Sequence, residues 1–197
     1  MKSLQYLFLG GLATLLMAAD CSNKDSEFYN DVFINSPNLI TVEDNAPYST
    51  GDNLVILANF PRAIQEVGQS TMIDLYKTTG ATAFTFSYLL EKEVGAGQWS
   101  AIEIAQNNLV QNDGNTVAYG DFVLAQTVYD PVTESYRYRA GVQMVQPGAY
   151  RLRFTYNQEP SAAIVLTSDS SNGNIFATIF SSSADLDGGG YYYFTVN

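Results

Sequence analysis

Hydrophobic and polar positions alternate over short stretches from residue 38 to the C-terminus. These stretches are rich in Val, Ile, Thr, Tyr and Phe, and Gly, Asn, Asp and Pro separate them. Alternation with a period of two is typical of a half-buried β-strand, and no stretch after residue 20 sustains a helical period. The pattern therefore predicts an all-β chain, with strands near 38–43, 53–60, 72–77, 82–92, 98–105, 116–129, 134–145, 149–157, 162–168, 174–181 and 190–196. This many short strands with regular turns favours a sandwich over an open sheet.

The strongest alternation predicts a hairpin between strands 134–145 and 149–157. Even-numbered positions are apolar from Tyr136 to Met144 and from Tyr150 to Tyr156, so these positions should share the buried face. Two residues that lie opposite each other across the hairpin must then be both even-numbered or both odd-numbered. This condition requires a loop with an odd number of residues. The segment Gln146–Gly148 supplies a three-residue loop with Gly at the position that favours positive φ. Val142 is therefore expected to face Leu152 across the hairpin.

Two segments resemble parts of fibronectin type III and related immunoglobulin-like modules. Segment 87–99, SYLLEKEVGAGQW, is similar to their central strands, with a turn and a Trp. Segment 130–142, DPVTESYRYRAGV, resembles their proline-to-tyrosine corner, with Tyr136 as the corner tyrosine and a spacing one residue off. The resemblance covers about 38–157 and implies an antiparallel immunoglobulin-like β-sandwich. The later strands either extend this sandwich or form a small addition to it, and we expect one domain, 36–197.

The first residues predict an export signal. A positive start, Met1-Lys2-Ser3, precedes an apolar run from Leu4 to Met17 and small residues before Cys21. The run is shorter than the roughly 20 apolar residues that cross a bilayer. A cysteine at this place resembles the lipobox of bacterial lipoproteins, which implies a cleaved signal peptide, 1–20, and lipid attachment at Cys21. Asp20 departs from the lipobox pattern, and cleavage after Ala19 would instead leave a soluble chain.

The residues after Cys21 predict a flexible tether, 21–35, because 22–27 is entirely polar. Acidic residues just after the cysteine also resemble the surface-export tag of lipoproteins in glycan-scavenging Gram-negative bacteria. We therefore expect lipid anchoring in the outer membrane, with two orientations left open: the domain faces either the periplasm or the cell surface.

Composition narrows the range of partners and reactions that the chain can support. The net charge is −11, with or without residues 1–20, and this argues against binding to nucleic acid or electrostatic docking on anionic lipid. The chain holds one cysteine and no histidine. An internal disulfide, a His/Cys zinc site and Ser-His-Asp or Cys-His catalysis are therefore excluded. We expect no cofactor and no enzymatic activity; the one enzyme class left open is a paired-carboxylate glycosidase using Glu91, Glu93 or Glu103.

Four arginines are the first candidate site. On the predicted hairpin, Arg137, Arg139, Arg151 and Arg153 would project together from the outer face and could bind an anionic partner. The alternative is that they pair with carboxylates on neighbouring strands, such as Glu103 or Asp121.

Aromatic residues are the second candidate site. Trp99, Tyr191 and Tyr193 could stack on sugar rings, as in carbohydrate-binding modules, although Trp99 could instead be the buried anchor of the sandwich. In a strand, Tyr191 and Tyr193 must face away from Tyr192 and Phe194. Two acidic loops, 169–174 and 185–190, could bind calcium or serve as plain turns, and we favour turns.

These features together predict a non-catalytic cell-envelope lipoprotein that is a binding or accessory subunit of an outer-membrane or cell-surface complex. One alternative is a glycan-binding surface lipoprotein that acts with a polysaccharide-uptake system, and the other is the glycosidase. The expected partners are the membrane, through the N-terminal lipid, and an outer-membrane protein or a glycan.

Overall fold

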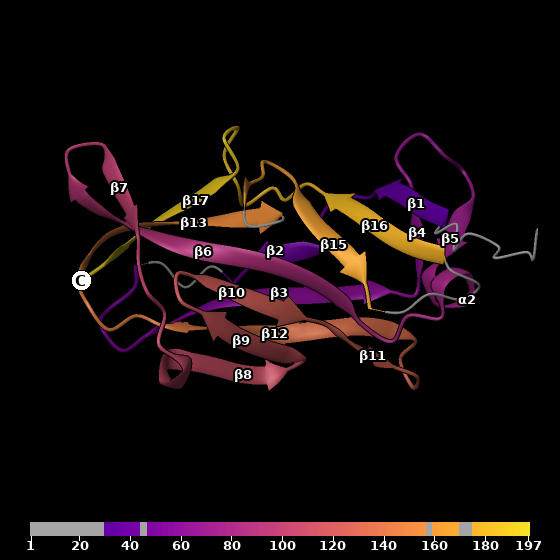
Figure 1. Ribbon diagram of the computed structural model, residues 1–197, viewed down its shortest axis with the longest axis horizontal. Helices are drawn as coiled ribbons and strands as arrows, with labels where there is room; N and C mark the ends of the chain where they lie inside the picture. The colour runs from indigo at the N-terminus through magenta and orange to yellow at the C-terminus, as the bar shows by residue number, and fades with distance from the viewer. Residues whose placement is uncertain (1–29, 44–46, 157–158, 170–174) are drawn as a thin grey trace, which may run out of the picture.

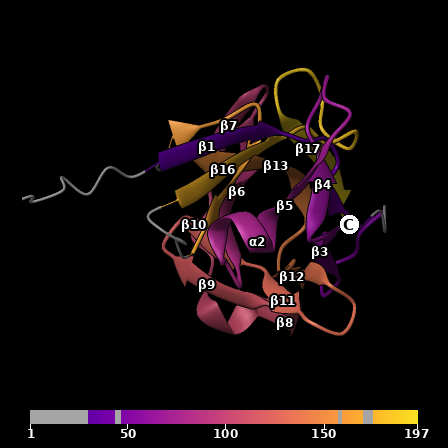
Figure 2. The same cartoon turned by 90° about the vertical axis from the view of Figure 1, so that its right-hand side faces the viewer.

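The protein is all-β and mostly antiparallel. A computed structural model describes residues 30–43, 47–156, 159–169 and 175–197. Two sheets pack face to face, and a two-stranded sheet with one short helix lies at one end of them (Figures 1 and 2).

The large sheet has ten strands. Its main path is β1 (Asn30–Asn35), β16 (Ile175–Ser181), β15 (Ile164–Ser168), β6 (Phe84–Gly95), β10 (Phe122–Gln126) and β9 (Asn115–Tyr119). Attached to this path are β13 (Gly148–Tyr156), β14 (Glu159–Pro160), β17 (Tyr191–Val196) and β7 (Gln98–Ala101). The long strand β6 organises the sheet, because it pairs with β7, β10, β13 and β15 along its length.

The small sheet faces the inner side of the large one. It is formed by β11 (Val128–Asp130), β12 (Ser135–Gln143), β3 (Asn53–Pro61) and β2 (Ile40–Val42), with β8 (Leu109–Asp113) also paired to β12. The third sheet is β4 (Ala63–Gln65) with β5 (Met72–Asp74), followed by α2 (Leu75–Thr79); η1 (Gln106–Asn108) is a single 3-10 turn.

Aromatic side chains pack between the large sheet and the small sheet. Phe84 of β6 packs against Phe60 of β3 and Tyr136 of β12, with ring centroids 6.1 and 4.9 Å apart. Phe86 packs edge-on against Tyr138 at 5.1 Å. Edge-to-face pairs of this kind contribute about 0.5–1.5 kcal/mol each beyond the area that they bury. The inner faces of both sheets therefore form one continuous core.

The predicted hairpin between 134–145 and 149–157 is wrong. β12 pairs with β3, so Val142 lies opposite Leu54, whereas β13 pairs with β6 and β17 in the other sheet. The alternation correctly indicated which residues are buried, but both strands bury one face toward the same core from opposite sheets. Gly141 supports the observed pairing, because a Cβ at this position would collide with the Leu54 backbone of β3.

Several predicted boundaries also change. Residues 30–35, the end of the predicted tether, form β1, which pairs in parallel with β16. The predicted strand 72–77 becomes β5 and α2, because the Asp74 side chain accepts a hydrogen bond from the Lys77 N–H and begins a helix that Gly80 ends in a left-handed conformation. The predicted strand 116–129 is three strands, and β8 was not predicted.

Candidate functional site

The four candidate arginines do not share one surface. Because β12 and β13 lie in different sheets, Arg137 and Arg139 project from the small sheet, and Arg151 and Arg153 project from the large one. The predicted single patch is therefore wrong, although each pair does project outward.

Arg151 and Arg153 close around one carboxylate. The register of β6 and β13 places Glu91 beside Arg151, whose Nε donates to Glu91 Oε2 at 2.5 Å. Arg153 Nη2 lies 3.4 Å from Glu91 Oε1. The side chains are 8%, 16% and 20% exposed for Glu91, Arg151 and Arg153. The arginines thus pair with a neighbouring strand, as the alternative interpretation expected, but their partner is Glu91 rather than Glu103 or Asp121.

All three aromatic candidates gather around Arg151. Its guanidinium carbon lies 4.8 Å from the ring centroid of Trp99 and 4.1 Å from that of Tyr191. Tyr193 meets Trp99 edge-on at 5.6 Å and lies 5.9 Å from Tyr191. We call Trp99, Arg151, Tyr191 and Tyr193 the aromatic–arginine cluster. Its rings pack around Arg151, which is ion-paired with Glu91, and they give the outer face of the large sheet an aromatic surface.

Strand register explains the convergence. On β17, Tyr191 lies opposite Arg153 and Tyr193 opposite Arg151, so both tyrosines share the outer face with the arginines. Trp99 reaches the same face from β7, where it lies opposite Glu93 of β6. Trp99 is half-buried on the outside of the sheet, so it is not the buried anchor of the sandwich. Tyr193 remains 49% exposed and is the most accessible ring of the cluster.

The Arg151 guanidinium remains charged in this setting. Burial lowers its pKa, but hydrogen bonds with Glu91 and Tyr193 outweigh this effect and raise the pKa above its ordinary value. A charged guanidinium held between two rings contributes about 0.5–2 kcal/mol by cation–π attraction. The arginine thereby fixes the orientation of Trp99 and Tyr191, which pre-organises the aromatic surface.

The arginines of the small sheet have different surroundings. Arg139 Nη2 lies 2.8 Å from Glu43, and Arg137 Nη1 lies 3.3 Å from Asp130. Their side chains are 42% and 40% exposed, more than twice the exposure of Arg151.

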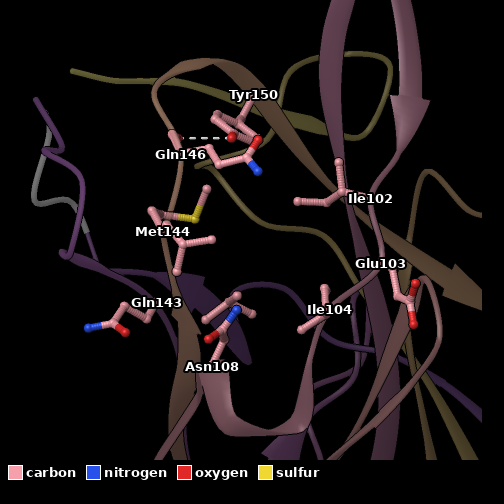
Figure 3. A pocket seen from close by; sticks show the side chains of 10 residues that line it. Ile102, Glu103, Ile104, Asn108, Gln143, Met144, Gln146 and Tyr150 are labelled. Atoms are coloured by element: carbon pink, nitrogen blue, oxygen red, sulfur yellow. Dashed lines mark hydrogen bonds between the residues drawn. The ribbon is translucent and has the colours of Figure 1, made fainter.

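A cavity of about 270 Å³ opens at one end of the sandwich (Figure 3). Two connections between the sheets form its walls: 102–108, which leads from β7 toward β8, and 144–147, which leads from β12 to β13. Its lining includes Ile102, Ile104, Val142, Met144 and Tyr150 among apolar residues, and Glu103, Asn108, Gln143 and Gln146 among polar ones. Sequence reasoning missed this cavity because the predicted hairpin removed the crossover that creates it.

A second, more open hollow lies at the opposite end, beside β4 and β5. It has a volume of about 410 Å³ and is lined mainly by apolar residues, including Leu39, Ile64, Val67 and Met72. Val67 and Met72 are 66% and 52% exposed.

The carboxylates that were candidates for catalysis make structural contacts or face solvent. Glu91 binds Arg151 and Arg153, Glu93 Oε1 accepts the Gly97 N–H at 2.8 Å in the β6–β7 turn, and Glu103 is exposed.

The acidic loops use their carboxylates as acceptors for backbone N–H groups, either within a turn or from a distant segment. Asp187 accepts hydrogen bonds from the Gly189 and Tyr191 N–H groups, and Asp185 accepts from Val42. Asp169 accepts from Thr82 and Ala83, while most of the other predicted calcium loop, 170–174, lies outside the described residues. Within the part of the chain that the structure describes, no three His, Cys, Asp or Glu residues are grouped to hold a metal ion.

The predicted signal peptide, Cys21 and tether residues 21–29 lie outside the described residues. In the ranges that the structure does describe, no helix has the length and apolar character needed to span a membrane.

Comparison with known proteins assigns no family. No family model matches the chain, and no curated protein matches its sequence.

Proposed function

We propose that this chain is a non-catalytic, lipid-anchored binding protein of the bacterial cell envelope, and that the aromatic–arginine cluster is its glycan-binding surface. The convergence of Trp99, Tyr191 and Tyr193 on one outward face carries this proposal. Aromatic faces pack against the C–H faces of sugar rings, and their affinity rises when the rings are held rigid before binding. Arg151, held by Glu91, supplies that rigidity.

The separation of the arginines favours glycan binding over docking of an anionic partner. An anionic site needs clustered positive charge, but Arg137 and Arg139 have carboxylate partners of their own, and Arg151 and Arg153 share Glu91, which leaves that group with a single net positive charge. An aromatic surface does not require net charge, so it remains compatible with a chain of net charge −11.

The position of the cluster suits display at a surface. Asn30, where β1 begins, lies at one end of the long axis, whereas β7 and β17 lie toward the other end (Figure 1). An anchor at Cys21 would therefore hold the domain by the end far from the cluster. The immunoglobulin-like character of the sandwich is part of the proposal and is supported by two packed, mostly antiparallel sheets.

Retention on insoluble and immobilised polysaccharides tests the binding surface. We expect the wild-type protein to be retained by at least one polysaccharide of a broad panel. Trp99→Ala and Tyr193→Ala should each weaken that binding at least about tenfold, the equivalent of about 1.4 kcal/mol. Tyr119→Ala is the matched control, since Tyr119 is an exposed tyrosine, 53% accessible, on the distant edge strand β9.

Two outcomes would overturn the proposed surface: equal binding by wild-type protein and the Trp99→Ala variant, or no retention on any polysaccharide. In the second case, co-purification of a stoichiometric protein from detergent-solubilised membranes would favour an accessory subunit instead. Anchoring is tested separately, because Cys21→Ala should move the protein out of the membrane fraction. A Cys21→Ala protein that stays with the membrane would contradict the lipid anchor.

A further inference from the structure

We infer that the cavity between the two sheet crossovers is a second binding site, which takes one uncharged sugar ring or a similarly small polyhydroxylated molecule. The site is separate from the aromatic–arginine cluster in its lining residues, and it does not depend on the cluster binding a glycan.

The cavity is built by the fold. Segment 102–108 leaves the large sheet after β7, and segment 144–147 enters it before β13, so the two connections diverge at the same end of the sandwich. The Tyr150 hydroxyl donates to the Gln146 backbone oxygen at 2.9 Å and fixes the second connection (Figure 3). Met144 N–H donates to Asp52 O at 2.8 Å and fixes it further. Binding would therefore require little ordering of these walls.

The lining combines apolar surface with neutral amides. Ile104 and Met144 point into the cavity from opposite walls (Figure 3). The Asn108 amide points into the cavity from below, and the Gln146 amide lies above. Among the described residues, the half-buried Asn108 side chain has no hydrogen-bond partner, although its backbone N–H donates to Ala105 O. An amide offers both a donor and an acceptor, which matches hydroxyl groups.

The charged groups nearby are not directed at a ligand. Glu103 points away from the cavity (Figure 3). The Lys92 ammonium donates to Gln146 Oε1 at 3.1 Å and lies over the Tyr150 ring. Lys92 does not line the cavity, and the one charged residue in the lining, Glu103, points away from it, so an ionised ligand would lose its hydration without gaining an opposite charge from the cavity wall. The volume of about 270 Å³ lies just below the range of about 300–1,000 Å³ that is usual for drug-sized ligands, and it suits a single ring.

Methyl NMR of methionine tests this site directly. Removal of residues 1–20 leaves two methionines: Met144 lines the cavity, and Met72 lies on β5 at the other end of the molecule (Figure 1). The protein as purified from cells, with labelled methionine methyl groups, would be titrated with free glucose, galactose, mannose and N-acetylglucosamine. We expect at least one of these sugars to shift the Met144 signal in a saturable manner and to leave the Met72 signal in place.

Asn108→Ala should weaken that binding at least about tenfold, because the ligand hydroxyls lose their amide partner. Asn107→Ala is the matched control, since the neighbouring Asn107 lies on the same turn and is exposed. An unshifted Met144 signal with all four sugars would overturn the site. Equal shifts of Met144 in the wild-type and Asn108→Ala proteins would overturn the role given to the amide and, with it, the proposed binding mode. Neither result depends on Trp99, so failure here is distinguishable from failure of the proposed glycan surface.

Discussion

The two arginine pairs have the same sequence pattern and opposite surroundings. Arg151 and Arg153 on the large sheet share one nearly buried carboxylate, and aromatic rings cover Arg151. Arg137 and Arg139 on the small sheet contact separate carboxylates at the solvent boundary, and both side chains are about two-fifths exposed. An Arg-x-Arg pattern therefore places both arginines on the same face of a strand. It does not determine their surroundings, which depend on the neighbouring strands.

The difference bears on function as well as stability. A buried ion pair that loses one partner leaves an uncompensated charge, whereas an exposed pair is replaced by water at little cost. Glu91 is thus a supporting element of the candidate binding surface, and Glu43 is a surface residue with a small energetic role. Measurements at Glu91, at Asp74 and at Glu43 test how the cost of losing an ion pair depends on its burial.

The largest effect is expected from Glu91→Gln. The substitution leaves Arg151 and Arg153 without a compensating charge beneath the aromatic rings, so the free energy of unfolding should fall by about 3–5 kcal/mol. Urea unfolding, followed by Trp99 fluorescence and circular dichroism, measures this change. Glu43→Gln is the matched control on the small sheet and should cost at most about 1 kcal/mol. Equal costs for the two substitutions would remove the contrast.

An intermediate effect is expected at Asp74, whose ion pair with Arg62 is partly exposed and which also caps α2. Loss of an N-cap costs about 1 kcal/mol, so Asp74→Ala should reduce stability by about that amount at neutral pH. Hydrogen bonds from Arg62 and from the Lys77 N–H lower the pKa of Asp74 below its usual value of 3.8. Because the pKa of Asp74 is lower in the folded than in the unfolded protein, the ionised carboxylate stabilises the fold at pH values above 3.8. This contribution is lost as the pH falls from 3.8 through the lowered pKa.

The pH dependence distinguishes the charge of Asp74 from its capping role. Asp74→Asn keeps a side chain that can accept the Lys77 N–H, but it does not titrate. Stability measured from pH 7 down to pH 2 should therefore fall less in Asp74→Asn than in the wild-type protein. Parallel pH profiles for the two proteins would show that the carboxylate charge contributes nothing.

The smallest effect is expected from the coupling between Arg139 and Glu43. A double-mutant cycle should give about 0.2–1 kcal/mol at low salt, and 1 M salt should reduce this coupling because screening acts strongly on exposed pairs. The equivalent cycle for Arg151 and Glu91 should retain most of its coupling energy in high salt. A salt-sensitive Arg151–Glu91 coupling would contradict the burial assigned to that pair.

Much of the fold could be predicted from local pattern. Alternation correctly identified the all-β class and the inward face of β12 and β13, including Tyr138 and Phe154 in the core. The predicted strands 82–92 and 98–105 also form, as the paired strands β6 and β7. The assignment of β12 and β13 to different sheets could not be predicted. Both strands have apolar side chains at even-numbered positions, and the loop between them has a length that suits a hairpin.

The candidate site was predicted as separate pieces. The arginines and aromatics were recognised individually, and the period of a strand predicted that Tyr191 and Tyr193 share the face opposite to Tyr192 and Phe194, without indicating which face is outward. Their convergence required the register of β13 with β6 and β17, which is a long-range property. Glu91 was considered for catalysis, and only its place beside Arg151 revealed its role in the ion pair.

The most direct test of the central proposal uses Trp99, which is the sole tryptophan and lies in the aromatic–arginine cluster. Its fluorescence therefore reports on this surface alone, and a polysaccharide retained by the protein can be titrated as soluble oligosaccharides while calorimetry measures total binding. The proposal predicts a saturable change in Trp99 emission with the same Kd as calorimetry. Calorimetric binding with an unchanged Trp99 emission would place the ligand elsewhere and contradict the proposed surface.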